Sequence, residues 1–316
     1  MNKVLSVLFV VLVAGCASNI NNSQDITPSV VSSFYPIEYI VSELEPDLVQ
    51  HNLVGQKNIH GFDLSTTDVV MMEKADLVLG LNLELEPWLK ASLDKNLVLA
   101  NADLNLLEAN ADFHHDEQTD DPEDEHSDEH EDDHEDDHED DHSDEHDHGD
   151  LTHDPHVWMS PKNMMQMAKN IYDALESKNL LSNNAEKRFN QLKLNLAELD
   201  KKFENQLQNC QEKTAFISHD SFAYIEGAYG LELTHILGLS SMDRLSFKDV
   251  GELEQVSASA VLVEALENQE YANLLKKDLN LDSFVVYNLS KKVDDLDYLE
   301  MQNRNLESIK SALKCN

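Results

Sequence analysis

The sequence predicts an α/β protein of two lobes, each with a mainly parallel sheet, joined by one long rigid helix. Its 316 residues are about right for two domains of ordinary size. Short apolar runs alternate with helix-patterned segments on both sides of the chain's middle, which is typical of parallel sheets. Between them, residues 182–210 contain no Pro or Gly and repeat apolar residues at spacings of three and four. A helix of some 25 residues would reach roughly 37 Å, enough to run along both lobes.

The first lobe is expected to begin with a short strand that runs into an amphipathic helix, within "VVSSFYPIEYIVSEL". Thr66 or Thr67 can cap a second helix, which leads into the buried strand "ADLVLGLN". A further helix is expected to start near Glu84, and "KNLVLAN" reads as the next strand. These elements alternate as a parallel sheet requires.

The second half repeats this alternation. Ser160 is a plausible N-cap with Pro161 at the first helical position, ahead of a helix that precedes the long one. Beyond the long helix, strands are expected at 214–220, 231–239, 259–266 and 282–290, and helices at 221–230, 248–258, 268–279 and 297–314.

The chain begins with features of an exported lipoprotein. Lys3 precedes an apolar run from Val4 to Ala14, which is too short to span a bilayer and reads as a secretory signal over residues 1–15. "VAGC" resembles a lipobox, in which Cys16 would carry lipid, and residues 16–29 would form a polar leash. The alternative is an ordinary signal peptide with a chance cysteine.

The remaining chain divides by composition. We expect an N-terminal lobe at 30–111 and 151–184, a disordered acidic loop at 112–150, the linking helix at 185–210 and a C-terminal lobe at 211–316.

Net charge bears on the partners. The formal charge is −39, and residues 112–150 hold 23 acidic residues without any Lys or Arg. The rest of the chain is still acidic, which argues against nucleic acid and anionic membrane surfaces and favours cationic ligands.

Two cysteines remain beside Cys16. An exported protein meets an oxidising compartment, so Cys210 and Cys315 are expected to form a disulfide that pins the C-terminal tail to the second lobe. The alternative is two free thiols.

The acidic segment contains histidines at every fourth residue. Repulsion among its carboxylates should keep it unfolded, while imidazoles together with carboxylates suit many weak, interchangeable metal sites. The alternative is a solvating acidic loop with incidental histidines. The candidate accessory residues are His114, His115, His126, His130, His134, His138, His142, His146 and His148.

Outside that segment, three histidines stand at loop or strand-end positions. His60 lies in an irregular segment, His156 precedes a capped helix and His219 ends a strand, where ligands of α/β proteins bind. A cleft between the lobes could unite them as a His₃ zinc site. His51, at an expected helix end, and His235, in an expected strand, are predicted to be structural.

Three motifs carry a resemblance to a known family. "ADLVLGLNLELEPWL", "DPHVWMSPKN" and "ISHDSFAYIEGAYGL" resemble, in order and spacing, the substrate-binding lipoproteins of bacterial metal ABC importers. The acidic His-rich loop before "DPHVW" resembles their zinc-type branch, the ZnuA-like cluster A-I. The likeness runs from about Val30 to the C-terminus. It implies two α/β lobes on a rigid helix, with the metal in the cleft between them.

The resemblance also implies the ligands. His60, His156 and His219 match the family's metal-binding histidines, and the manganese-type branch carries glutamate at the last position. Nitrogen there favours zinc. The family's late aspartate is replaced by Asn288, a poor ligand, which leaves a zinc-loaded site of net charge +2. Water or Glu264 can take the fourth position, although Glu264 can equally be a second-shell or structural residue.

The predicted function is capture of zinc outside the cytoplasm and its delivery to an ABC-type permease. The chain would be a monomer, held to a membrane only by lipid, at the cell surface or in the periplasm. The alternative is a zinc buffer or adhesion lipoprotein without a transporter. A zinc hydrolase is disfavoured, because the sequence contains no HExxH, GxSxG or Gly-rich phosphate loop.

Overall fold

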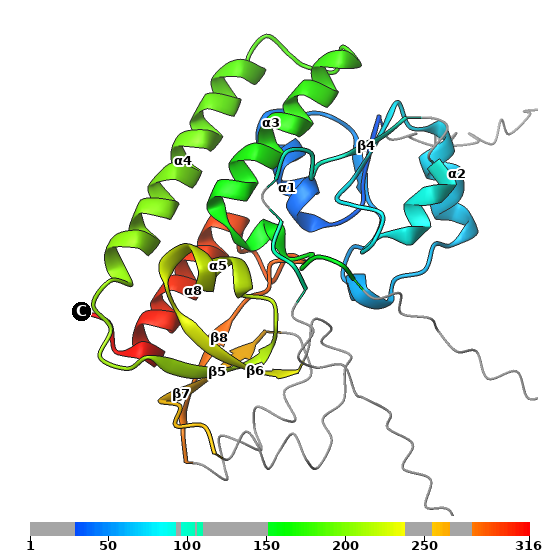
Figure 1. Ribbon diagram of the computed structural model, residues 1–316. Helices are drawn as coiled ribbons and strands as arrows, with labels where there is room; N and C mark the ends of the chain where they lie inside the picture. The colour runs from blue at the N-terminus through cyan, green and yellow to red at the C-terminus, as the bar shows by residue number, and fades with distance from the viewer. Residues whose placement is uncertain (1–28, 93–95, 105, 110–150, 238–254, 266–279) are drawn as a thin grey trace, which may run out of the picture.

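Two four-stranded parallel sheets, one in each half of the chain, organise the fold (Figure 1). The computed structural model describes residues 29–92, 96–104, 106–109, 151–237, 255–265 and 280–316. Several predicted features lie outside these residues, apart from Ser29 and positions 255–258: the signal peptide, Cys16, the leash, the nine accessory histidines and the helices expected at 248–258 and 268–279.

The N-terminal sheet has the strand order β2-β1-β3-β4, with all neighbours parallel. Its helices follow the strands as crossover connections, which a parallel sheet requires. The elements are β1 Val30–Ser32, α1 Tyr35–Leu44, β2 Gln50–Asn52, η1 Ile59–Gly61, α2 Thr66–Lys74, β3 Leu77–Gly80, η2 Pro87–Ser92, β4 Leu97–Leu99, η4 Val157–Met159 and α3 Pro161–Ser177.

The C-terminal sheet has the order β6-β5-β7-β8, again all parallel. Gly230, with φ +69°, ends the helix before β6, in the left-handed conformation that glycine adopts without strain. The elements are β5 Thr214–His219, α5 Ala223–Tyr229, β6 Glu232–Leu237, β7 Ala260–Glu264, β8 Asp282–Val286 and α8 Tyr298–Leu313. The two sheets confirm the predicted α/β class.

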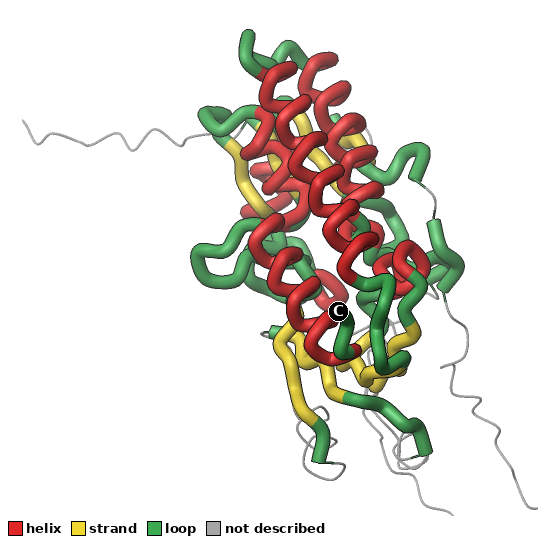
Figure 2. The backbone as a smooth tube through the Cα atoms, turned by 90° about the vertical axis from the view of Figure 1, so that its left-hand side faces the viewer, coloured by secondary structure: helices red, strands yellow, loops and turns green. Residues whose placement is uncertain are grey.

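The helix α4, Ala185–Gln206, links the halves. Its 22 residues extend about 33 Å at the usual helical rise. It packs against α1 and α3 of the N-terminal lobe and against α8 of the C-terminal lobe, so it runs alongside both lobes (Figure 2). Leu192, Leu196, Leu199 and Phe203 form its buried stripe and join a core that continues from one lobe into the other. None of the helices in the described part of the chain combines the length and apolar composition that a bilayer-spanning helix needs.

At three places the structure differs in detail from the local predictions. Ser65, rather than Thr66 or Thr67, caps α2, because its hydroxyl and the Asp68 carboxylate form a reciprocal capping box. The helix expected near Glu84 is the short 3-10 helix η2, which begins at Pro87. The polar strand β2 was missed because "QHN" carries no apolar alternation and lies at the edge of its sheet, so His51 is in a strand and not at a helix end.

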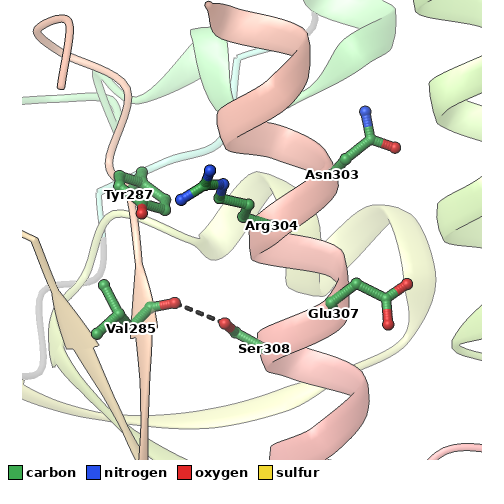
Figure 3. Close-up of a pocket in the computed structure, with 6 residues that line it drawn as sticks. All are labelled: Val285, Tyr287, Asn303, Arg304, Glu307 and Ser308. Carbon is green, nitrogen blue, oxygen red and sulfur yellow. Dashed lines mark hydrogen bonds between the residues drawn. The ribbon is translucent and has the colours of Figure 1, made fainter. Parts of the chain in front are cut away.

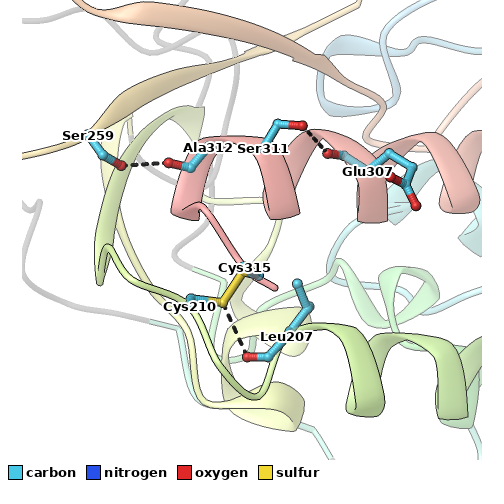
Figure 4. Close-up of a disulfide and its surroundings, with 7 residues drawn as sticks. All are labelled: Leu207, Cys210, Ser259, Glu307, Ser311, Ala312 and Cys315. Atoms are coloured by element: carbon cyan, nitrogen blue, oxygen red, sulfur yellow. Dashed lines mark hydrogen bonds between the residues drawn. A yellow bond between two sulfur atoms is a disulfide. The ribbon is translucent and has the colours of Figure 1, made fainter.

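The chain's last residues are fastened to the segment after α4. Cys210 and Cys315 form a disulfide across 105 residues (Figure 4). Next to it, the backbone N–H of Gln211 donates to Lys314 O. The C-terminal end of α8 is thereby tied to the C-terminal end of the linking helix.

Candidate metal centre

Three histidines from distant parts of the sequence converge between the two sheets. His60 lies in η1, where the Asn58 side chain accepts its backbone N–H, and comes from the N-terminal lobe. His156 directly precedes η4, and His219 is the last residue of β5 in the C-terminal lobe. Each is therefore held by a loop or strand end whose backbone is fixed by its own lobe.

Their rings form a compact triangle. The ring centroids lie 5.4 Å apart for His60 and His156, 5.4 Å for His156 and His219, and 6.3 Å for His60 and His219. One nitrogen atom from each ring lies within 4.8 Å of the other two. Ligand nitrogens about 2.0–2.1 Å from a shared zinc ion stand roughly 3.4 Å apart, so modest side-chain rotations would complete the site.

Asp154 sets the orientation of the His156 ring. Its Oδ1 atom lies 2.8 Å from His156 Nδ1 and also accepts the His156 backbone N–H at 2.8 Å. Nδ1 is thus assigned as the protonated nitrogen. The His156 Nε2 atom is buried and makes no hydrogen bond among the described residues, which leaves its lone pair for a cation.

Glu264 does the same for His219, because their strands are neighbours. In the β5–β7 register, Phe216 pairs with Val261 and Ile217 with Leu262. Continuing that register sets His219 opposite Glu264 at the carboxyl end of the sheet. Glu264 is fully buried, and its Oε2 lies 2.9 Å from His219 Nδ1. His219 Nε2 is therefore the nitrogen turned to the cleft.

Asn288 follows β8, the next strand, and contacts Glu264. Its Nδ2 donates to Glu264 Oε2 at 3.0 Å, and its Oδ1 accepts from the backbone and hydroxyl of Ser290. Ser221 donates to the other oxygen of Glu264. The amide thus helps to hold the Glu264 carboxylate in place beside His219.

The electrostatics favour a neutral His60 imidazole and an ionised Glu264 carboxylate. Burial, and next the neighbouring His156 and His219, lower the pKa of His60 well below its usual value. Burial alone would raise the pKa of Glu264, but His219 beside it and the hydrogen bonds from His219 and Ser221 lower it below the ordinary glutamate value. A cation entering the triangle would therefore meet the lone pair of a neutral His60 and, behind His219, the negative charge of Glu264.

The two lobes are joined directly behind the histidines. Trp158, fully buried, donates from Nε1 to Asn288 O at 2.7 Å, and its own carbonyl accepts from Tyr298 of α8. Its ring also packs edge-on against His156, at a centroid distance of 5.3 Å. Packing and these bonds account for Trp158 without a ligand role.

The structure brings the residues of the sequence-based site together, with one neighbour that the sequence analysis did not name. His60, His156 and His219 come together, and Glu264 and Asn288 adjoin them behind His219. The sequence analysis overlooked Asp154. An Asp two residues before His156, as in "DPH", can accept the backbone N–H of that histidine in an Asx-type turn, which was the available signal.

His235 is not merely a strand residue. Its Nε2 lies 3.0 Å from Glu226 Oε2 and 3.3 Å from Asp220 Oδ1, so the prediction of a structural residue overlooked two acidic neighbours. The error arose because Glu226 reaches it from a different element, α5.

A surface hollow elsewhere lacks metal ligands of this kind. It measures about 420 Å³ and lies between β8 and α8, where Ser308 donates to Val285 O (Figure 3). Its lining residues are Val285, Tyr287, Asn303, Arg304, Glu307 and Ser308. With one carboxylate and no histidine, it is a poor competitor for a transition-metal site.

Comparisons with known proteins point the same way. The family model described as the periplasmic zinc-uptake complex component A matches residues 30–312. The zinc-binding lipoprotein AdcA of Streptococcus pneumoniae is 23% identical over 310 residues, which cover 90% of this chain and 55% of that protein. The chain therefore spans about half the length of this relative. The high-affinity zinc uptake system protein ZnuA of Bacillus subtilis is 26% identical over 341 residues, 99% of each chain.

Solved structures share the fold. The zinc-bound ZnuA-like domain of S. pneumoniae AdcA superposes with a TM-score of 0.68 at 21% identity, over 91% of this chain and 99% of that one. The laminin-binding protein Lmb of Streptococcus agalactiae, described as a bifunctional protein with adhesin and metal transporting activity, gives a TM-score of 0.71 at 21% identity, over 90% and 99%. At this identity, the likeness establishes the fold alone.

Proposed function

Since the chain belongs to the family of periplasmic zinc-uptake complex components, we propose that it captures zinc outside the cytoplasm and delivers it to an ABC-type metal permease. The observation that carries the proposal is the triangle of His60, His156 and His219, drawn from both lobes. Three imidazole nitrogens are a donor set that suits zinc better than the harder manganese.

Zinc is the cargo, and the three histidines are its proposed ligands. Glu264 acts through His219 and Asp154 acts through His156, each accepting from Nδ1 so that Nε2 faces the cation. Such outer partners fix the ring and raise its basicity. Glu264 is thus proposed as a positioning residue and not as the fourth ligand.

These two carboxylates also balance the charge. Three neutral imidazoles alone would leave zinc with its full +2, as the sequence suggested. Asp154 and Glu264, one imidazole away and almost fully buried, bring the local sum to zero. The amide of Asn288 stabilises this arrangement by donating to Glu264 without adding charge.

The fourth coordination position is left for water or another small donor. An exchangeable ligand suits a site that must both hold zinc and release it. The long helix α4 and the bonds around Trp158 join the lobes, so loading is proposed to involve loop motion and small tilts.

The setting follows from the N-terminal sequence. Export by residues 1–15 and lipid on Cys16 would tether a monomer to a membrane and leave it facing the periplasm or the cell surface. The His-rich segment at 112–150 would gather zinc near the cleft. No enzymatic activity is proposed.

Calorimetric zinc titration tests the proposal. The full chain should show one tight site that His219→Ala weakens by orders of magnitude and that deletion of residues 114–150 leaves intact. His51→Ala, which removes a histidine from β2, is the matched control. Loss of the tight site in the deletion, or an unchanged His219→Ala variant, would show that the ligands have been misassigned.

A cellular assay separates transport from the alternative. Zinc uptake should depend on the chain in cells that carry the permease, and His219→Ala should abolish that dependence. A zinc buffer or adhesion lipoprotein would leave the uptake rate unchanged.

A further inference from the structure

The indole of Trp158 joins the parts of the chain that carry His156 and His219. It belongs to η4, two residues after His156, and packs edge-on against the ring of that histidine at a centroid distance of 5.3 Å. On another side it packs against Phe34, which follows β1, at 4.8 Å. Its Nε1–H donates at 2.7 Å to the carbonyl of Asn288, which follows β8 of the C-terminal sheet. This one side chain therefore contacts both lobes.

The residue that accepts this hydrogen bond also supports His219. The Nδ2 atom of Asn288 donates to Glu264 Oε2 at 3.0 Å, and the same oxygen lies 2.9 Å from His219 Nδ1. Only two residues, both buried, thus stand between the Trp158 indole and the His219 ring. Since the indole touches the His156 ring on its other side, a displacement of one histidine is passed on to the other through direct contacts.

The turn that presents the Asn288 carbonyl has an uncommon backbone conformation. Leu289, the next residue, is buried and has φ +61°, in the left-handed region that residues other than glycine rarely adopt. Such a conformation persists only where the surrounding contacts impose it. Here the Asn288 Oδ1 accepts from the N–H and the hydroxyl of Ser290, while Trp158 holds the carbonyl. Because backbone strain of this kind clusters at functional sites, the turn is a second indication that the direction of this carbonyl serves the site.

The helix α8 fixes both ends of the indole hydrogen bond. Three of its polar side chains are fully buried, at spacings of four and three residues that put them on one face. Tyr298 donates to the Trp158 carbonyl, and Gln302 donates to the carbonyl of the residue after it. Asn305 exchanges two hydrogen bonds with the backbone directly before Asn288. The donor and the acceptor are therefore held on a common scaffold, which preorganises the bond between them.

From these contacts we propose that Trp158 is a positioning residue whose Nε1–H sets the spacing between His156 and His219 and thereby slows the release of zinc, an inference that rests on the proposed function. The two rings belong to different lobes, so their spacing depends on what joins the lobes beside them. Zinc held by both rings leaves when they separate, and the indole hydrogen bond opposes that separation. Loss of the bond should therefore raise the dissociation rate constant and change the association rate constant little.

Replacement of the indole N–H by sulfur tests the inference. The sequence has two tryptophans, and Trp88 Nε1 finds no hydrogen-bond partner in the described part of the chain, so Trp88→Phe leaves Trp158 as the only indole at little cost. In that background, a tryptophan auxotroph supplied with 3-benzothienylalanine keeps the shape of the ring and removes its donor. Stopped-flow transfer of zinc to a chromophoric chelator should then be about tenfold faster than with ordinary tryptophan, which is the lower end of the usual effect of outer partners on metal affinity.

Two controls accompany this measurement. The same replacement in a Trp158→Phe chain changes only residue 88, and it should not alter the release rate of that chain. Guanidinium unfolding of the zinc-free proteins separates positioning from stability, because a bond that served stability alone would lower the free energy of unfolding and leave zinc release unchanged.

Equal release rates with and without the N–H, in folded proteins, would overturn the inference and leave the proposed function standing. Absence of a tight zinc site in the Trp88→Phe protein with ordinary tryptophan would overturn the proposed function, and this inference with it. If the substituted chain does not fold, hydrogen exchange of the Trp158 indole N–H in the unmodified chain decides. Because coupling is reciprocal, zinc should slow this exchange more than it slows exchange of the buried backbone N–H groups of α8. Slowing by the same factor at all of these groups would overturn the inference.

Discussion

Replacing Glu264 by glutamine isolates what a buried carboxylate contributes to zinc affinity. Three donors converge on its two oxygens, from His219, Ser221 and Asn288. Glutamine has nearly the same volume and can turn its oxygen toward His219 and Asn288. Its NH₂ group then faces the Ser221 hydroxyl, which can rotate to accept. The ring of His219 should stay in place while the negative charge disappears.

The expected loss follows from the role of such outer partners. Removing one typically lowers metal affinity 10- to 100-fold, which is about 1.4 to 2.7 kcal/mol. We expect a loss in this range for Glu264→Gln, because the carboxylate is fully buried and thus little screened by water. His219→Ala, which deletes a ligand, should cost far more.

Competition with a chromophoric zinc chelator measures the tight site without interference from weaker ones. Glu45→Gln is the matched control, because Glu45 is also buried but pairs with Arg188 instead of a histidine. Unchanged zinc affinity in a folded Glu264→Gln protein would refute the positioning role. A loss as large as that of His219→Ala would identify Glu264 as a direct ligand.

Three further predictions concern pH, Asn288 and the disulfide. The pKa of His60 is lower in the folded chain than the usual ~6.5, so the zinc-free protein should lose stability as pH falls below about 6.5. Thermal unfolding measured across this pH range should show the loss, and a melting temperature that does not change with pH would contradict it. Asn288→Asp places a second carboxylate where Asn288 Nδ2 now lies 3.0 Å from Glu264 Oε2. Because the two carboxylates repel or share a proton, we expect zinc affinity to fall or to become dependent on pH. Tighter zinc binding at every pH would mean that the new carboxylate ligates zinc. Cys315→Ser opens a 105-residue loop closed by Cys210 and should lower the free energy of unfolding by about 2 to 5 kcal/mol in guanidinium titrations, unless the reduced tail stays docked.

Local sequence patterns were enough to predict much of the fold. Strand and helix periodicities gave both parallel sheets, and Ser160 with Pro161 marked the start of α3 as the structure has it. The uninterrupted stretch around Leu192–Phe203 gave the linking helix. These features depend on the order of residues within one element, and the sequence states that order directly.

Contacts between side chains of different strands and helices could not be predicted from local sequence patterns. Glu264 could be named as a candidate, yet its contact with His219 depends on β5 and β7 being neighbours in register, which follows from strand order in the sheet. His235 looked ordinary for the same reason, since Glu226 meets it from another element.

The sequence by itself determined the candidate donors of the proposed zinc site: three histidines at loop and strand ends, in motifs that resemble those of a zinc-binding family. Only the tertiary structure decided how that chemistry is tuned, by setting Asp154 behind His156 and Glu264 behind His219. The physical reason is that hydrogen bonds and charge act over a few ångströms in space. Residues separated by 45 positions, as His219 and Glu264 are, become neighbours only when the sheet forms.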